Sequence, residues 1–172
     1  MSKNEILIFY QLIHDIIKSD EFLKMSMQKH HIKTSVYDHC LKVAYLCYKH
    51  HRKYNCKTDI KEVIRAALLH DYFLYDRINK KSGDDINRFV HLFKHPATAL
   101  HNAEHDYPDL TRKERNAIQR HMFPIVPIPP TTACGWMVCY YDKVAAIGDY
   151  LHIQRWKKEL IEYCPEIQGG VL

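Results

Sequence analysis

The chain has 172 residues and a formal net charge of +5 at pH 7, and its length is enough for one domain with an ordinary hydrophobic core. We expect a soluble cytoplasmic protein, because no secretory signal is visible. The longest apolar stretch, residues 133–141, is also about half the roughly 20 residues that a membrane helix needs. The basic residues are scattered, so the positive balance alone does not indicate nucleic-acid binding or exclude it.

The six cysteines form no C-x-x-C pair and no regular framework. This spacing argues against a disulfide scaffold or a zinc ribbon, and it predicts reduced thiols that pack as small hydrophobic side chains.

The first half of the chain predicts helices with buried apolar stripes. Residues 5–18 and 21–28 fit two packing helices, and residues 29–31 fit a basic turn. Thr34 or Ser35 can cap the next helix, in which His39 lies beside an apolar stripe. The helix that follows ends in the pair His70-Asp71, which prolongs its buried face. Burying a lone carboxylate costs several kcal/mol, roughly, so Asp71 needs a partner or a metal.

The second half predicts three more helices after a loop at residues 80–85. His95 is expected just outside a helix that Pro96 opens, because Pro suits the first helical position. Thr111 and Glu114 have capping-box spacing at the start of a helix over 112–121, which places His121 at its inner end. A last long helix over 132–151 carries Asp142 within an apolar face. The chain is therefore predicted to be an all-α bundle of about six to eight helices.

Histidine and aspartate thus recur on the inner sides of separate helices. We expect these side chains to converge, and nitrogen and carboxylate ligands without thiolates suit divalent iron, manganese, zinc or cobalt. The candidate metal ligands are His39, His70, Asp71, His95, His121 and Asp142.

At this point the chain resembles the HD superfamily of metal-dependent phosphohydrolases, whose signature is His, then His-Asp, then a distant Asp. His39, His70-Asp71 and Asp142 have that order, in the contexts DHCLKVA, ALLHD and DKVA. The resemblance covers about residues 35–150, which implies one HD domain over 1–172 with N-terminal packing helices and a short C-terminal extension.

The resemblance also implies a ligand arrangement. His95 and His121 lie where members with two metals have two further histidines. One ion would be held by His39, His70, Asp71 and Asp142, and the other by His95 and His121, with Asp71 bridging. The Gly-Tyr-Pro motif of the cyclic-di-GMP phosphodiesterases and the Gly-Lys that often follows His-Asp are missing, which argues against that subgroup. The pattern is most similar to small bacterial HD proteins, and more distantly to HD-type diadenosine tetraphosphate hydrolases.

The predicted function is hydrolysis of a phosphomonoester or phosphodiester, with a nucleotide-type substrate. A two-metal site would lower the pKa of a bridging water and clamp the phosphoryl oxygens. Asp71 and Lys143 are the predicted catalytic residues, with Asp71 orienting the nucleophile and Lys143 neutralising phosphate charge, a role also open to Arg120 or Arg77.

Two other classes of function stay open. One is a metal-containing module that binds or senses a nucleotide without turnover, and the other is a helical nucleic-acid binder. Aromatic residues that follow His-Asp, together with Phe123, can stack on a base or simply pack. The sequence identifies neither the substrate nor the metal, and it does not set the oligomeric state.

Overall fold

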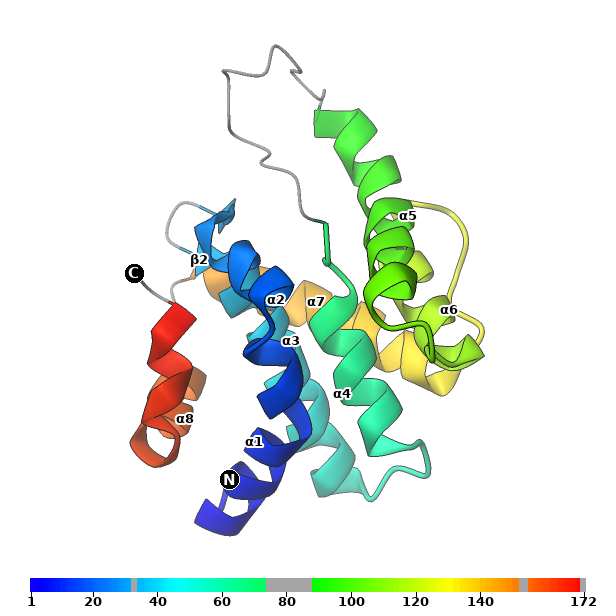
Figure 1. Ribbon diagram of the computed structural model, residues 1–172. Helices are drawn as coiled ribbons and strands as arrows, with labels where there is room; N and C mark the ends of the chain where they lie inside the picture. Colours follow the sequence, from blue (N-terminus) through cyan, green and yellow to red (C-terminus); the bar gives the residue numbers. More distant parts are fainter. Residues whose placement is uncertain (32–33, 74–87, 152–154, 171–172) are drawn as a thin grey trace.

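The computed structural model describes residues 1–31, 34–73, 88–151 and 155–170 (Figure 1). These residues form eight α-helices, two short 3-10 helices and one pair of very short antiparallel strands, so the all-α prediction is confirmed. The α-helices are α1 (Lys3–Ile17), α2 (Asp20–Lys24), α3 (Val36–Tyr54), α4 (Ile60–Leu69), α5 (Arg88–Asp106), α6 (Arg112–Arg120), α7 (Ala133–Tyr150) and α8 (Arg155–Tyr163); the remaining elements are η1 (Met25–Met27), η3 (Pro165–Gly170), β1 (Lys29–His31) and β2 (Thr34–Ser35).

Most helices begin where a short oxygen-bearing side chain accepts a backbone N–H. This cap satisfies a donor that has no partner inside the first turn. Ser35 caps α3, as one of the two predicted candidates, and Thr132 caps α7. Thr111 and Glu114 form the predicted capping box of α6, in which each side chain accepts from the other's backbone.

Helix α3 lies at the centre of the bundle and packs against α4 and α7 (Figure 1). Helix α6 packs on both α4 and α7, while α1 packs against α4 and α8. The buried ring of Phe9 on α1 meets Tyr45 edge-on at 6.1 Å and lies 5.2 Å from Tyr48, with both tyrosines on α3. The N-terminal helix is therefore part of the core, as predicted.

Two local predictions differ from the structure, and one helix was not predicted. Helix α5 starts at Arg88, so Pro96 lies inside it and His95 is not at a helix entrance. A proline in mid-helix lacks the N–H that would bond to the carbonyl four residues earlier, and its ring crowds that carbonyl. Helix α5 nevertheless continues through Pro96. The basic segment 29–31 is a strand paired with Thr34–Ser35, and α8 was not specified from the sequence.

The helices also bear on membrane insertion. Within the described ranges, none of them is both long enough and apolar enough to cross a membrane.

Candidate metal centre

His39 is held between two carboxylates in the interior. It lies in the first turns of α3 and is fully buried. Its Nε2 is 3.1 Å from Oδ1 of Asp142, and its Nδ1 is 2.9 Å from Oδ2 of Asp149. Both acids come from α7, so the packing of α3 on α7 fixes the orientation of this imidazole.

His70 is the residue that ends α4. Its Nδ1 donates to the carbonyl oxygen of Ala67 at 2.8 Å, which leaves Nε2 to face the interior. That Nε2 is 3.7 Å from Oδ2 of Asp71 and 3.7 Å from Oδ1 of Asp142. It is buried and has no hydrogen-bond partner among the described residues. A buried acceptor nitrogen facing two carboxylates fits the binding of a cation.

His121 repeats this arrangement at the end of α6. Its Nδ1 donates to the carbonyl of Ile118 at 2.7 Å, and its Nε2 lies 3.4 Å from Oδ1 of Asp71. Nε2 of His95, from the interior of α5, is 3.3 Å from the same oxygen and 2.9 Å from Nε2 of His121. One oxygen of Asp71 thus faces His95 and His121, and the other faces His70.

The donor atoms form two overlapping groups. His39, His70 and Asp142 make one group, and His70, Asp71 and His121 make the other, with all ligand atoms of a group within 4.8 Å of one another. Imidazole and carboxylate donors of this kind suit divalent transition metals. Cys40 approaches His70 only on its Nδ1 side, at 3.9 Å, and burial raises the pKa of its thiol, so it is not a thiolate donor.

The electrostatics of the centre favour a positive charge. Burial raises the pKa of Asp142, but the hydrogen bond from His39 together with the nearby His70 and the charge of Lys143 outweighs it and holds that pKa well below its usual value. Burial lowers the pKa of His70, but the charge of Asp71 together with the contributions of Cys40 and Asp142 outweighs it and raises that pKa well above normal. Burial lowers the pKa of His121 to about 4, so this ring is neutral at physiological pH. The negative electrostatic potential that favours protonation of His70 also favours the binding of a metal cation.

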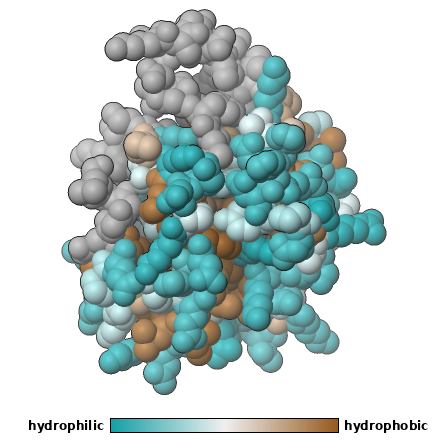
Figure 2. Space-filling model, in the orientation of Figure 1, coloured by the Kyte–Doolittle hydropathy of each residue, from teal (hydrophilic) through white to brown (hydrophobic). Residues whose placement is uncertain are grey.

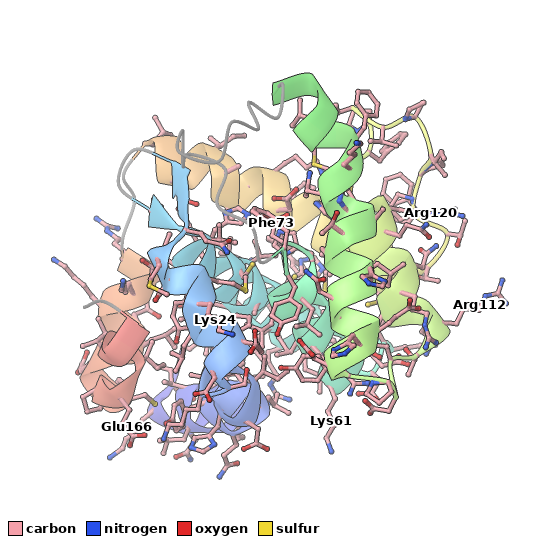
Figure 3. The ribbon with its side chains drawn as sticks, turned by 45° about the horizontal axis from the view of Figure 1, so that its top comes forward. Lys24, Lys61, Phe73, Arg112, Arg120 and Glu166 are labelled. Carbon is pink, nitrogen blue, oxygen red and sulfur yellow. The ribbon has the colours of Figure 1, made fainter. Side chains whose placement is uncertain are left out.

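Lys143 lies at the edge of the centre. Its ammonium donates to Oδ2 of Asp142 at 3.1 Å and to the carbonyl of His121, and a third of the side chain is exposed. Arg120 instead donates to the carbonyl of Pro129 and lies at the outer side of α6 (Figure 3). Arg77 lies outside the described residues.

The candidate aromatic residues pack in the interior. Tyr72 and Phe73 are buried, Tyr72 donates to Asp106, and the ring of Phe73 lies 5.9 Å from that of His95 (Figure 3). Phe123 packs edge-on against Trp136. Tyr75 lies outside the described residues.

Two further charged residues belong to this centre and were not predicted from the sequence. Asp149 accepts from His39 and also from Lys42, whose ammonium is 2.7 Å from Oδ1. Both side chains are almost completely buried, with residue exposures of 1% and 4%. The available signal was their spacing, since Asp149 follows Asp142 by two helical turns and Lys42 follows His39 by one.

The fold and the centre define an all-α domain whose interior gathers histidines and aspartates suited to a divalent cation. The family model of the HD domain matches residues 36–147, more than half of the chain, and the protein therefore belongs to the HD domain family. Members of this family are commonly metal-dependent phosphohydrolases. Membership therefore suggests that this protein has metal-dependent hydrolase activity in general. Neither the comparison with curated proteins nor the comparison with solved structures finds a match.

Proposed function

We propose that the protein is a metal-dependent phosphohydrolase that cleaves a phosphomonoester or phosphodiester bond, using two divalent ions and a nucleotide-type substrate. The observation that carries the proposal is the position of Asp71 between two sets of imidazoles. Its Oδ2 is 3.7 Å from Nε2 of His70, and its Oδ1 is 3.3 Å and 3.4 Å from Nε2 of His95 and His121. A carboxylate placed in this way suits a bridge between two ions.

The ligands divide between two positions. His39, His70, Asp71 and Asp142 would hold one ion, while His95 and His121 would hold the second together with Asp71. The chemistry that two such ions supply when bound is a nucleophilic water of lowered pKa and charge stabilisation at the phosphoryl oxygens.

The protein's own groups supply orientation and charge. The Nδ1–H groups of His70 and His121 are held by backbone carbonyls, so both rings keep Nε2 directed at the carboxylates. Lys143 carries a partly exposed ammonium beside Asp142, where it is available to a phosphate that approaches from solvent. The choice of a nucleotide-type substrate rests on the resemblance to HD hydrolases, because the buried Tyr72 and Phe73 have packing partners.

The decisive test compares wild type with Asp71→Ala, using His105→Ala as a control at an exposed His-Asp contact outside the centre. Protein purified without added metal is analysed for bound metal and then tested, with manganese or iron, on a panel of nucleotides, phosphomonoesters and phosphodiesters. We expect wild type and the control to bind metal and hydrolyse at least one substrate class. Asp71→Ala should lose metal and activity.

Two results would contradict the proposal. Asp71→Ala that kept stoichiometric metal and full activity would remove Asp71 from the mechanism. Metal-loaded wild type that bound nucleotides tightly but hydrolysed nothing in the panel would indicate a nucleotide-binding module instead.

A further inference from the structure

Helix α7 has an outer face that is apolar. Among the positions of α7 whose side chains the structure describes, the exposed ones are Ala133, Trp136, Tyr140 and Ile147, and Leu151 caps the helix. None of these residues is charged. The solvent face of a helix normally carries charged and polar residues, so an apolar outer face indicates contact with another surface.

The α7 stripe, defined as Trp136, Tyr140, Ile147 and Leu151, lies along one side of the helix. At 3.6 residues per turn these positions fall within about 60° of one another around the axis. By the same count, Asp142 lies roughly 150° around the helix axis from the middle of the stripe, on the side that faces the metal centre. The described elements that pack most closely on α7 are α3, α4 and α6, and α7 crosses behind α3 and α4 in Figure 1. The face of the molecule in Figure 2 is, by contrast, mostly hydrophilic with small hydrophobic patches.

We propose that the α7 stripe is the contact surface of a symmetric homodimer, in which α7 packs antiparallel against α7 of a second copy. The spacing of the stripe is self-complementary. In a two-fold antiparallel helix pair, positions at equal distances on either side of the dyad face each other. With the dyad between residues 143 and 144, Trp136 faces the partner's Leu151, and Tyr140 faces the partner's Ile147. Lys143 flanks the stripe next to the dyad, and its ammonium turns away from the stripe to Asp142. The dimer then has four contacts between an aromatic ring and an aliphatic side chain, two from each copy.

The area of the stripe is sufficient for such a contact. The exposed fractions are 47% for Trp136, 62% for Tyr140, 61% for Ile147 and 60% for Leu151. With about 150–250 Å² for a whole aromatic side chain and somewhat less for an aliphatic one, the stripe exposes roughly 400 Å² per copy. Because interfaces are only about 57% apolar, roughly 800 Å² of apolar area over two copies corresponds to a total near 1,400 Å². That total lies within the range of stable complexes, about 1,200–2,000 Å².

The charges of α7 favour a protein partner over a lipid surface. Helices that bind membranes through one face are flanked by Lys and Arg that reach anionic lipids. The described part of α7 has one basic residue, Lys143, and its ammonium is engaged by Asp142 and the carbonyl of His121. The stripe therefore lacks the positive rim that a membrane surface would require.

The first test is the mass of the full chain in solution. Sedimentation velocity over a range of concentrations should show a reversible dimer for wild type. Ile147→Glu should raise the dimer dissociation constant by roughly 30-fold or more, as expected for charge at the centre of an apolar interface. Met27→Glu, at a more exposed apolar residue outside α7, should leave the constant unchanged. A monomeric wild type at all concentrations, or an Ile147→Glu dimer of unchanged affinity, would overturn the proposal, including the case in which the monomer binds vesicles or another protein.

The second test measures the register by cysteine cross-linking. Cys56→Ser removes the one cysteine that is not buried. In this background, Tyr140→Cys mixed with Ile147→Cys should form a mixed disulfide under mild oxidation, while each variant alone should not. Seven residues along a helix span about 10 Å, which exceeds the roughly 7 Å Cα separation that a disulfide tolerates. Self-cross-linking of each variant without the mixed product would indicate parallel helices and refute the antiparallel register.

Discussion

The substitution Asp149→Asn is expected to have two effects, one on the stability of the fold and one on the affinity of the metal centre. Asp149 accepts from Nδ1 of His39 at 2.9 Å and from Lys42 at 2.7 Å, and all three side chains are buried. Replacing the carboxylate by an amide of the same shape leaves the Lys42 ammonium without a counter-charge. Breaking a buried ion pair in this way costs about 3–5 kcal/mol. This is a large part of the roughly 5–15 kcal/mol that stabilises a typical domain.

The double variant Lys42→Met with Asp149→Asn removes both charges. Replacing a whole buried pair is often nearly neutral, so we expect the double variant to be more stable than Asp149→Asn alone. Metal affinity should not recover, because His39 still lacks the carboxylate that orients it and raises its basicity. The loss of such a partner typically weakens metal binding about 10–100-fold.

Urea unfolding in the presence of EDTA measures the first effect, and calorimetric titration with Mn²⁺ measures the second. Lys113→Met is the matched control, since its 2.8 Å ion pair with Glu62 is on the surface and is worth about 1 kcal/mol or less. Equal urea midpoints for wild type and Asp149→Asn would refute the stability argument. Full recovery of metal affinity in the double variant would refute the role of Asp149 in orienting His39.

Three further predictions concern the same region. Gly148→Ala should destabilise the fold by about 1–3 kcal/mol in thermal unfolding, because its new Cβ would lie 2.7 Å from Nζ of Lys42; an unchanged Tm would contradict this. Adding Mn²⁺ at about 100 times its dissociation constant should stabilise wild type by about 2.7 kcal/mol relative to EDTA, and Asp71→Ala should show no comparable gain. Lys143→Met should keep stoichiometric metal in elemental analysis while its kcat falls at least tenfold, since the proposed role of the ammonium is to neutralise phosphate charge without being a ligand; unchanged kcat would exclude that role.

The sequence predicts those parts of the fold that depend on local patterns. The capping box at Thr111 and the helix starts after Ser35 and Thr132 were predictable, because a cap involves residues close in the chain. The start of α5 was predicted incorrectly, because proline is favoured in the first turn and disfavoured in the interior of a helix, whereas α5 carries Pro96 in its interior.

The candidate ligands of the centre could be named from the sequence, but the charged residues that support them could not. His39, His70, Asp71 and Asp142 follow a family order, and the structure brings them together. Asp149 and Lys42 were missed because a Lys or an Asp on a helix is usually a solvated residue. Only the packing of α3 on α7 shows that these two charges face each other, 107 positions apart in the chain.

Two of the histidines in the metal centre also cap the C-terminal end of a helix. His70 and His121 each follow the last residue of a helix, and each donates Nδ1–H to the carbonyl three residues earlier. This bond satisfies a carbonyl that the helix leaves without a partner, and it fixes the ring so that Nε2 faces the centre as the acceptor. The negative ends of the α4 and α6 dipoles lie next to these rings, where they favour a cation. The same two side chains therefore cap the ends of helices and serve as candidate metal ligands. A substitution such as His121→Asn, which keeps a polar cap but loses Nε2, should remove metal affinity while costing little helix stability.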